Sequence, residues 1–87
     1  MTVWRFPIQI IDEQFIEMPK VNRPLHVEVQ SDVPCLWMLV EPESPRIKVR
    51  VRVFRTGSPG VRSTMDYIGT FQRNNFAYHV FFAGWEF

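Results

Sequence analysis

The stretch RIKVRVRV, residues 46–53, alternates strictly between basic and aliphatic side chains. Successive side chains of a β-strand point to opposite faces of the sheet. The pattern therefore predicts a strand with one aliphatic face toward a core and a row of four cations, about 6.6–7 Å apart, on the other face. The alternation inverts at Phe54-Arg55, where we expect a β-bulge or the end of the strand. The cations of this basic row are Arg46, Lys48, Arg50 and Arg52.

The rest of the chain also favours strands. Seven prolines, spread from residue 7 to residue 59, leave few windows for a helix, and those windows are rich in β-branched and aromatic residues. The only segment compatible with a helix is a single turn around residues 11–14, and we do not predict one there. The chain of 87 residues is long enough for one domain, and we predict an all-β fold for residues 1–87: a small antiparallel sandwich or barrel of six to seven short strands. The predicted strands are residues 3–8, 14–18, 25–30, 35–40, 46–55, 67–72 and 76–82.

Two pairs of these strands have the pattern of hairpins. In the first pair, Leu25, Val27 and Val29 alternate with polar residues, which predicts one buried and one wet face. Its partner, residues 35–40, is apolar at both parities and should lie at the centre of a sandwich or beneath a partner subunit. The second pair joins residues 67–72 to 76–82 through the turn RNN.

The chain is rich in large aromatic residues, with eight Phe and three Trp. So short a chain buries only about 60–65% of its unfolded surface, and we expect some aromatic side chains to stay exposed. The C-terminal segment FFAGWEF, residues 81–87, should dock on its own sheet or on a second copy. A homo-oligomer with a two-fold axis is the interpretation that we favour, and a monomer with its tail packed over the sheet end is the alternative.

The formal net charge of +1 conceals an uneven distribution. Residues 1–44 hold three basic and seven acidic side chains, a balance of −4, whereas residues 45–87 hold seven basic and two acidic ones, a balance of +5. The single cysteine, Cys35, lies in an apolar run and should be buried, which suits a reducing cytoplasm. No run of about 18 apolar residues and no signal sequence is present, so we expect a cytoplasmic protein without a membrane partner.

Two interpretations of the basic row stay open. In the first, the cations protect an edge strand against aggregation, or pair with Glu28, Glu41 and Glu43 on neighbouring strands. In the second, the row belongs to an anion-binding face, because Arg guanidinium groups bind phosphate in a bidentate manner.

The segment TGSPGVRST, residues 56–64, supplies further material for anion binding. It places flexible backbone N–H groups and four hydroxyls beside Arg55 and Arg62, as a phosphate nest requires. It has no phosphate-loop lysine and is not followed by a helix, so it is not a nucleotide-hydrolase signature. Trp37 or Tyr67 would offer a stacking platform for a base. The predicted ligand-binding residues are Trp37, Arg50, Arg52, Arg55, Thr56, Gly57, Ser58, Gly60, Arg62 and Tyr67.

Catalytic and metal sites are not indicated. His26, Cys35 and His79 lie on separate predicted strands, so we expect neither a metal site nor a cofactor. We interpret His79 as a core histidine; Asp66-Tyr67, near it across the second hairpin, forms either an acid/base pair or ordinary strand-end contacts. The acids Asp12-Glu13 lie in a turn without a partner motif. An enzyme is therefore the least favoured class of function.

Several segments resemble a family of short, uncharacterised proteins found mainly in phages and prophages. The resemblance rests on PCLWMLVEP (residues 34–42), VFRTG (53–57), YIGTFQ (67–72) and HVF (79–81), together with residues 10–20. The family brings no established activity and no catalytic residues. The resemblance implies an accessory role in the cytoplasm of a host cell, where small phage proteins often neutralise host defence.

The leading hypothesis is a non-enzymatic, phage-derived protein that counters host defence by sequestering an anionic, nucleotide-type ligand. The alternative is an inhibitor that binds a host defence protein complex through the basic face of residues 46–53. Direct nucleic-acid binding is not favoured. A minor virion or assembly component is a further alternative, supported only by the resemblance.

Overall fold

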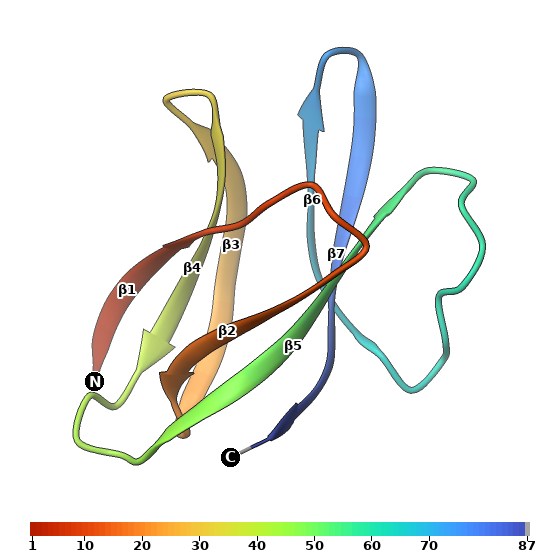
Figure 1. Cartoon of the computed structure of the whole chain (residues 1–87). Helices are drawn as coiled ribbons and strands as arrows, with labels where there is room; N and C mark the ends of the chain where they lie inside the picture. Colours follow the sequence, from red (N-terminus) through yellow and green to blue (C-terminus); the bar gives the residue numbers. More distant parts are fainter. Residues whose placement is uncertain (87) are drawn as a thin grey trace.

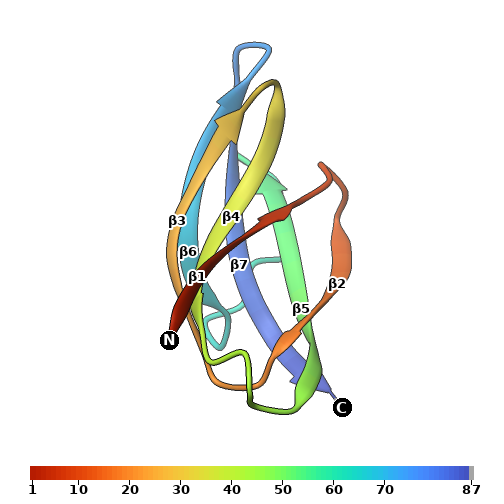
Figure 2. The ribbon, with the colours of Figure 1, turned by 90° about the vertical axis from the view of Figure 1, so that its left-hand side faces the viewer.

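The computed structural model describes residues 1–86, which form seven strands and no helix that could cross a membrane. All strand pairs are antiparallel and form two sheets. Sheet A has the order β1-β4-β3 and sheet B the order β2-β5-β7-β6. Figure 1 shows sheet A on the left with sheet B packed against it, and Figure 2 shows the layers after a quarter turn. The strands are β1 (Thr2–Pro7), β2 (Glu13–Pro19), β3 (Asn22–Gln30), β4 (Val33–Val40), β5 (Arg46–Arg55), β6 (Asp66–Arg73) and β7 (Phe76–Glu86).

This architecture confirms the predicted small all-β sandwich. Each of the seven predicted strands is present, and β5 has the predicted bounds. Both hairpins are confirmed, since β3 pairs with β4 and β6 with β7. No helical turn forms around residues 11–14, because β2 already begins at Glu13.

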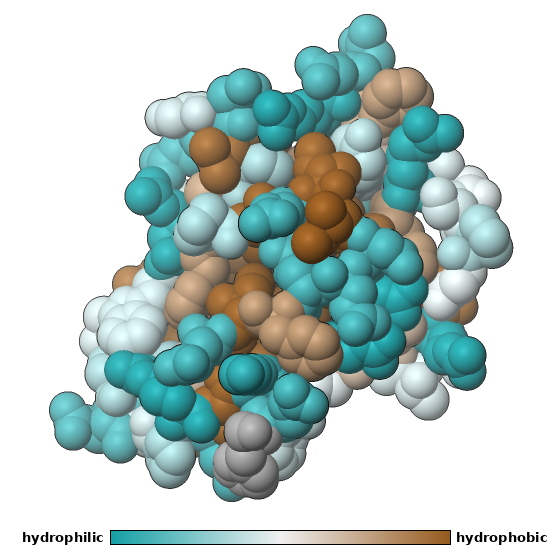
Figure 3. All heavy atoms as spheres, in the orientation of Figure 1, coloured by the Kyte–Doolittle hydropathy of each residue, from teal (hydrophilic) through white to brown (hydrophobic). Residues whose placement is uncertain are grey.

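The core lies between the two sheets. The aliphatic face of β5 supplies Ile47, Val49, Val51 and Val53, each at most 6% exposed. The chain passes from sheet A to sheet B after β1, returns after β2 and crosses again after β4. In Figure 3, hydrophobic residues lie along the middle of the molecule, where the connection from β1 to β2 crosses in front of the layers. The other buried members of the core are Ile8, Met18, Val27, Leu36, Met38, Val40, Phe71 and Val80.

The prediction for the buried face of β3 was wrong at one residue. Val27 is buried and Val29 half-buried, but Leu25 is 45% exposed. The register with β4 shifts between Pro24 and His26, so that Leu25 is the additional residue of a bulge and no longer faces the core.

The central strand of sheet A, β4, is apolar on both faces, as predicted. Its outer face carries Cys35, which is buried. Arg5 of β1 donates a hydrogen bond to the side-chain oxygen of Gln30 of β3. Because these strands flank β4, the bond spans β4 near Cys35 and helps to cover the thiol.

Of the two outcomes expected at Phe54-Arg55, the end of the strand is confirmed: β5 ends at Arg55, and its pairing with β7 is continuous up to that residue. The register instead shifts between Val49 and Val51, opposite Ala83 and Gly84 of β7, where Gly84 adopts a φ of 114° that suits glycine. Beyond this bulge β7 continues beside β5 to Glu86, so the described part of the C-terminal segment docks on its own sheet. Phe87, the last residue of that segment, lies outside the described residues.

The sandwich is closed on one side where β6 approaches β3 without pairing to it. A Cβ atom at Gly69 of β6 would lie 3.0 Å from Val27 Cβ and 3.1 Å from Val27 Cγ2. These distances are too short for an unstrained contact. Glycine at this position therefore allows the two sheets to meet closely.

We predict that Gly69→Ala lowers the free energy of unfolding by about 1–3 kcal/mol, because the added methyl group overpacks the contact with Val27. Chemical denaturation measures the change. In a double-mutant cycle, Val27→Ala should cost less in the Gly69→Ala background than in the wild type, since it removes part of the clash. Equal stability of Gly69→Ala and the wild type would contradict this packing.

Candidate functional site

The basic row points to the outer face of sheet B, as the alternation predicted, except that the guanidinium group of Arg46, at the start of β5, stacks over the Trp4 ring of β1, 5.0 Å from its centroid. There β5 lies between β2 and β7, and Arg52 is opposite Glu13 on one side and Phe81 on the other. Lys48 is opposite Glu17 and Glu86 in the same manner. The row is therefore bordered by acidic residues, and it is not an edge.

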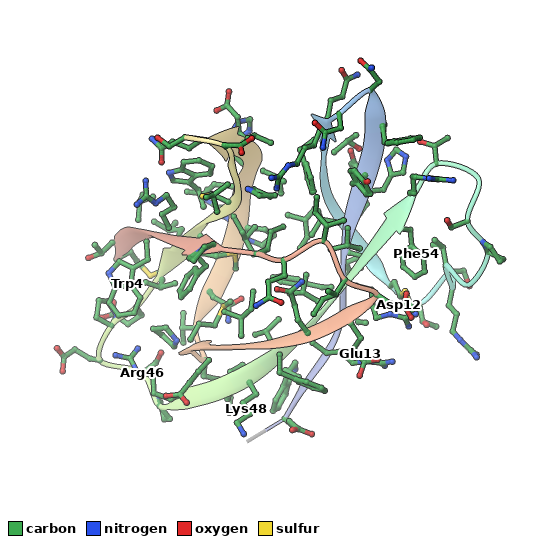
Figure 4. All side chains as sticks on the ribbon, turned by 45° about the horizontal axis from the view of Figure 1, so that its top comes forward. Trp4, Asp12, Glu13, Arg46, Lys48 and Phe54 are labelled. Atoms are coloured by element: carbon green, nitrogen blue, oxygen red, sulfur yellow. The ribbon has the colours of Figure 1, made fainter. Side chains whose placement is uncertain are left out.

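Two arginines of the row form ion pairs with the start of β2. Both Nε and Nη2 of Arg50 donate to one carboxylate oxygen of Glu13, at 2.9 and 2.6 Å. Arg52 donates through Nε to the main-chain oxygen of Asp12 at 2.9 Å and through Nη2 to its carboxylate at 3.2 Å. Figure 4 shows Asp12 and Glu13 close together at the start of β2, beside β5.

The expectation that cations of the basic row pair with acids of a neighbouring segment is thus confirmed for Arg50 and Arg52, but the acids named in the prediction were wrong. Glu28 contacts His26 on sheet A, and Glu41 contacts the N-terminal ammonium group. The acids Asp12 and Glu13, for which we expected no partner, fill this role. The spacing of Glu13 and Glu17, on one face of a strand, is the signal that could have identified a strand complementary to the basic row.

Phe54 is buried although it points to the same face as the basic row. The connection from β5 to β6, residues 56–65 and hereafter the 56–65 loop, covers it. A Cβ atom at Gly60 would lie 3.3 Å from the Phe54 ring, Arg52 lies over the same ring, and Phe81 meets it edge-on. The inverted alternation at Phe54 therefore marks a covered position on the outer face.

A chain of hydrogen bonds ties the 56–65 loop to sheet B. The Thr56 hydroxyl is 2.7 Å from His79 Nε2, and the Thr70 hydroxyl is 2.9 Å from His79 Nδ1. Tyr67 Oη bonds to the Thr70 hydroxyl in turn. The chain links Tyr67 to Thr56 and occupies both ring nitrogens of His79.

This arrangement corrects two expectations about His79. It lies half-buried on the outer face of sheet B and not in the core. The acid/base pair with Asp66-Tyr67 does not form, because threonine hydroxyls satisfy the imidazole and Tyr67 reaches it only through Thr70. Across residues 1–86, no three His, Cys, Asp or Glu side chains are grouped as a metal site would need.

A hollow of about 220 Å³ opens where β5 ends. Arg55 and Ser58 lie at this hollow, and Asp12 at its wall is already paired with Arg52. The guanidinium group of Arg55 stacks over the Phe76 ring, 4.6 Å from its centroid. The remaining lining residues are Ile10, Ile11, Val53, Phe54, Pro59 and Tyr78.

The structure brings together only part of the predicted site. Six of its residues lie at the end of β5 or in the 56–65 loop. They are Arg55, Thr56, Gly57, Ser58, Gly60 and Arg62. In residues 1–86, neither Arg55 nor Arg62 has a carboxylate within ion-pair distance.

The two aromatic platforms separate. Tyr67 lies on the outer face of sheet B, edge-on to Phe81 and tied to Thr56 through the hydrogen-bond chain. Trp37 lies on β4, where it is opposite Arg5 and His26 on the outer face of sheet A. The two outer faces point away from each other in a sandwich, so Trp37 cannot serve the same site as Arg50 and Arg52.

The fold and the site define a small all-β sandwich with a charge-paired sheet face and an open basic loop. The chain belongs to a family described as a domain of unknown function, DUF7352, which matches residues 1–85. No curated protein and no solved structure matches it. The match confirms an uncharacterised family, while its description mentions neither an activity nor phages.

We predict unequal roles for the two paired arginines. The Arg52 side chain is only 14% exposed and makes three polar contacts with Asp12 besides packing on Phe54. Arg52→Ala should lower the free energy of unfolding by about 1–3 kcal/mol. Arg50→Ala, at a more exposed position, should cost less than about 1 kcal/mol. Urea denaturation of both variants checks the order, and equal losses would contradict it.

We predict that Phe54→Ala releases the 56–65 loop from sheet B, because the loop packs on this ring. Limited digestion with trypsin should cleave after Arg62 faster than in the wild type, while strands on both sides stay protected. Phe15→Ala is the control, since Phe15 is an exposed aromatic residue on β2. Unchanged cleavage after Arg62 in Phe54→Ala would show that other contacts hold the loop.

Proposed function

We propose that this protein is a non-enzymatic binding protein that captures an anionic, nucleotide-type ligand at the end of β5 and the 56–65 loop. The observation that carries the proposal is the division of the cations. Asp12 and Glu13 already neutralise Arg52 and Arg50, whereas Arg55 and Arg62 have no carboxylate partner within residues 1–86. An added anion would gain most from the unpaired guanidinium groups.

The main chain of the loop supports the proposal. Gly57 and Gly60 have φ angles of 90° and 110°, and no atom lies within 4 Å of a Cβ placed at Gly57. A ligand can therefore approach this backbone closely. The hydroxyls of Thr56 and Ser58 flank Gly57 and offer additional donors.

The size of the hollow limits what it can hold. Its volume of about 220 Å³ is below the roughly 300–1,000 Å³ typical of pockets for whole small molecules. It suits a phosphate group held by Arg55 and Ser58, with the rest of the ligand outside. The Tyr67 ring, 59% exposed, is the surface on which a base would stack.

The resemblance to phage and prophage proteins suggests the biological setting of this proposal. A stoichiometric binder that sequesters a nucleotide signal needs no catalytic group, and it would act in the cytoplasm of the host to counter a defence system. The alternative, an inhibitor that binds a host defence complex through the basic face of β5, has less support. Its central cations, Arg50 and Arg52, are already paired within the chain.

We predict that calorimetry with a panel of mono-, di- and cyclic nucleotides detects binding, and that Arg55→Ala and Arg62→Ala each weaken it at least about tenfold, the loss of one charge-assisted contact. Arg46→Ala is the matched control: it removes the same charge at the opposite end of β5 and should leave affinity unchanged.

Two results would contradict the proposal. The first is that no nucleotide binds at about 100 μM, which would mean that the binding free energy is weaker than about 5.5 kcal/mol. Equal losses in Arg46→Ala and Arg55→Ala are the other, because they would indicate attraction by net charge alone.

A further inference from the structure

The outer face of sheet A exposes apolar side chains. Val3 is 53% exposed and Val33 43% exposed, while Trp37 and Leu39 are half-buried. The outward face of a sandwich sheet is ordinarily polar. An aromatic residue at the centre of an apolar patch, with charged residues at the border, is the usual anatomy of a protein interface.

The charges on this face lie symmetrically about Trp37. On β3, Arg23 is opposite Leu39, His26 opposite Trp37, and Glu28 opposite Cys35. Arg23 and Glu28 therefore lie on opposite sides of Trp37 along the strand direction. Each is one outward-facing position, about 6.6–7 Å, away from the row of residues that contains Trp37.

Within one chain these two charges are too far apart to pair. Their opposite residues on β4 are four positions apart, which corresponds to about 13 Å. Arg23 has no carboxylate partner within residues 1–86, and the contact of Glu28 is with His26 on the same strand.

A two-fold axis changes this relation. If the axis runs across the strands through the Trp37 row, in the plane between two facing sheets, β3 of one copy lies antiparallel over β3 of the other. Arg23 of each copy then faces Glu28 of its partner. Sheets that pack face to face stand about 10 Å apart, a gap that an Arg and a Glu side chain span together.

The second arginine on this face, Arg5, lies in the Trp37 row and does not oppose this arrangement. Its hydrogen bond to Gln30 turns it toward the β3–β4 turn and away from the axis. The centre of the face is left to Trp37, with Leu39 and Val3 in the next row.

We propose that two copies of this chain associate through the outer faces of their A sheets, with Trp37 at the two-fold axis and two symmetric Arg23–Glu28 ion pairs. This surface is separate from the 56–65 loop, so both copies of the ligand site stay accessible. The face has only three strands, about 4.8 Å apart. We therefore expect a small buried area, near the lower limit of about 1,000–1,200 Å² for specific interfaces, and a weak dimer with a micromolar Kd.

Analytical ultracentrifugation across a concentration series tests the dimer. The wild type should show a monomer–dimer equilibrium, and Arg23→Glu and Glu28→Arg should each raise the Kd at least about tenfold, since each replaces two attractions by two repulsions. The double variant Arg23→Glu/Glu28→Arg restores opposite charges across the axis and should recover the affinity. Arg62→Glu, the same charge reversal on the 56–65 loop, should leave the dimer unchanged.

A wild type that stays monomeric at every concentration overturns the proposal. A dimer that resists both single reversals, or a double variant weaker than either single variant, overturns the assigned surface. Circular dichroism of each variant confirms that the sheets are intact, and because both residues are exposed, we expect no loss of fold.

Discussion

The structure depends on the alternation of β5. Its aliphatic face closes the core between the sheets, and two cations of its charged face, Arg50 and Arg52, form ion pairs with Glu13 and Asp12. A row of cations on a central strand would otherwise repel one another at about 7 Å. The pairing therefore favours β2 as the neighbour of β5 in sheet B.

This use of charge has a functional consequence. Two of the cations that fit the strand pattern, Arg50 and Arg52, link β5 to the start of β2, whereas the proposed ligand site lies beyond them at Arg55 and Arg62. Phe54 connects the two roles, because its ring holds the 56–65 loop against the sheet beside Arg52. A ligand at the loop would thus bind next to a rigid strand, and the anchored end of the loop would lose little conformational entropy on binding.

The sequence predicted the strands well, because period-two patterns and proline-rich turns are local signals. β5 was predicted residue for residue, but Leu25 was misplaced because a bulge depends on the partner strand and not on the local pattern. The candidate site was predicted only in part. Which sheet a strand joins is decided by packing across the chain, so Trp37 and Tyr67 could not be separated, and the partners Asp12 and Glu13 were missed.

We propose that anion binding is confined to Arg55 and the 56–65 loop, where Arg55 and Arg62 have no carboxylate partner within residues 1–86. Backbone amide spectra recorded during titration with inorganic phosphate, the group that all nucleotide ligands share, test this proposal most directly. We expect the largest shifts at residues 55–62, above all at the amides of Gly57 and Gly60, with small changes at residues 46–52. Shifts centred on the basic row, or none anywhere, would contradict the account.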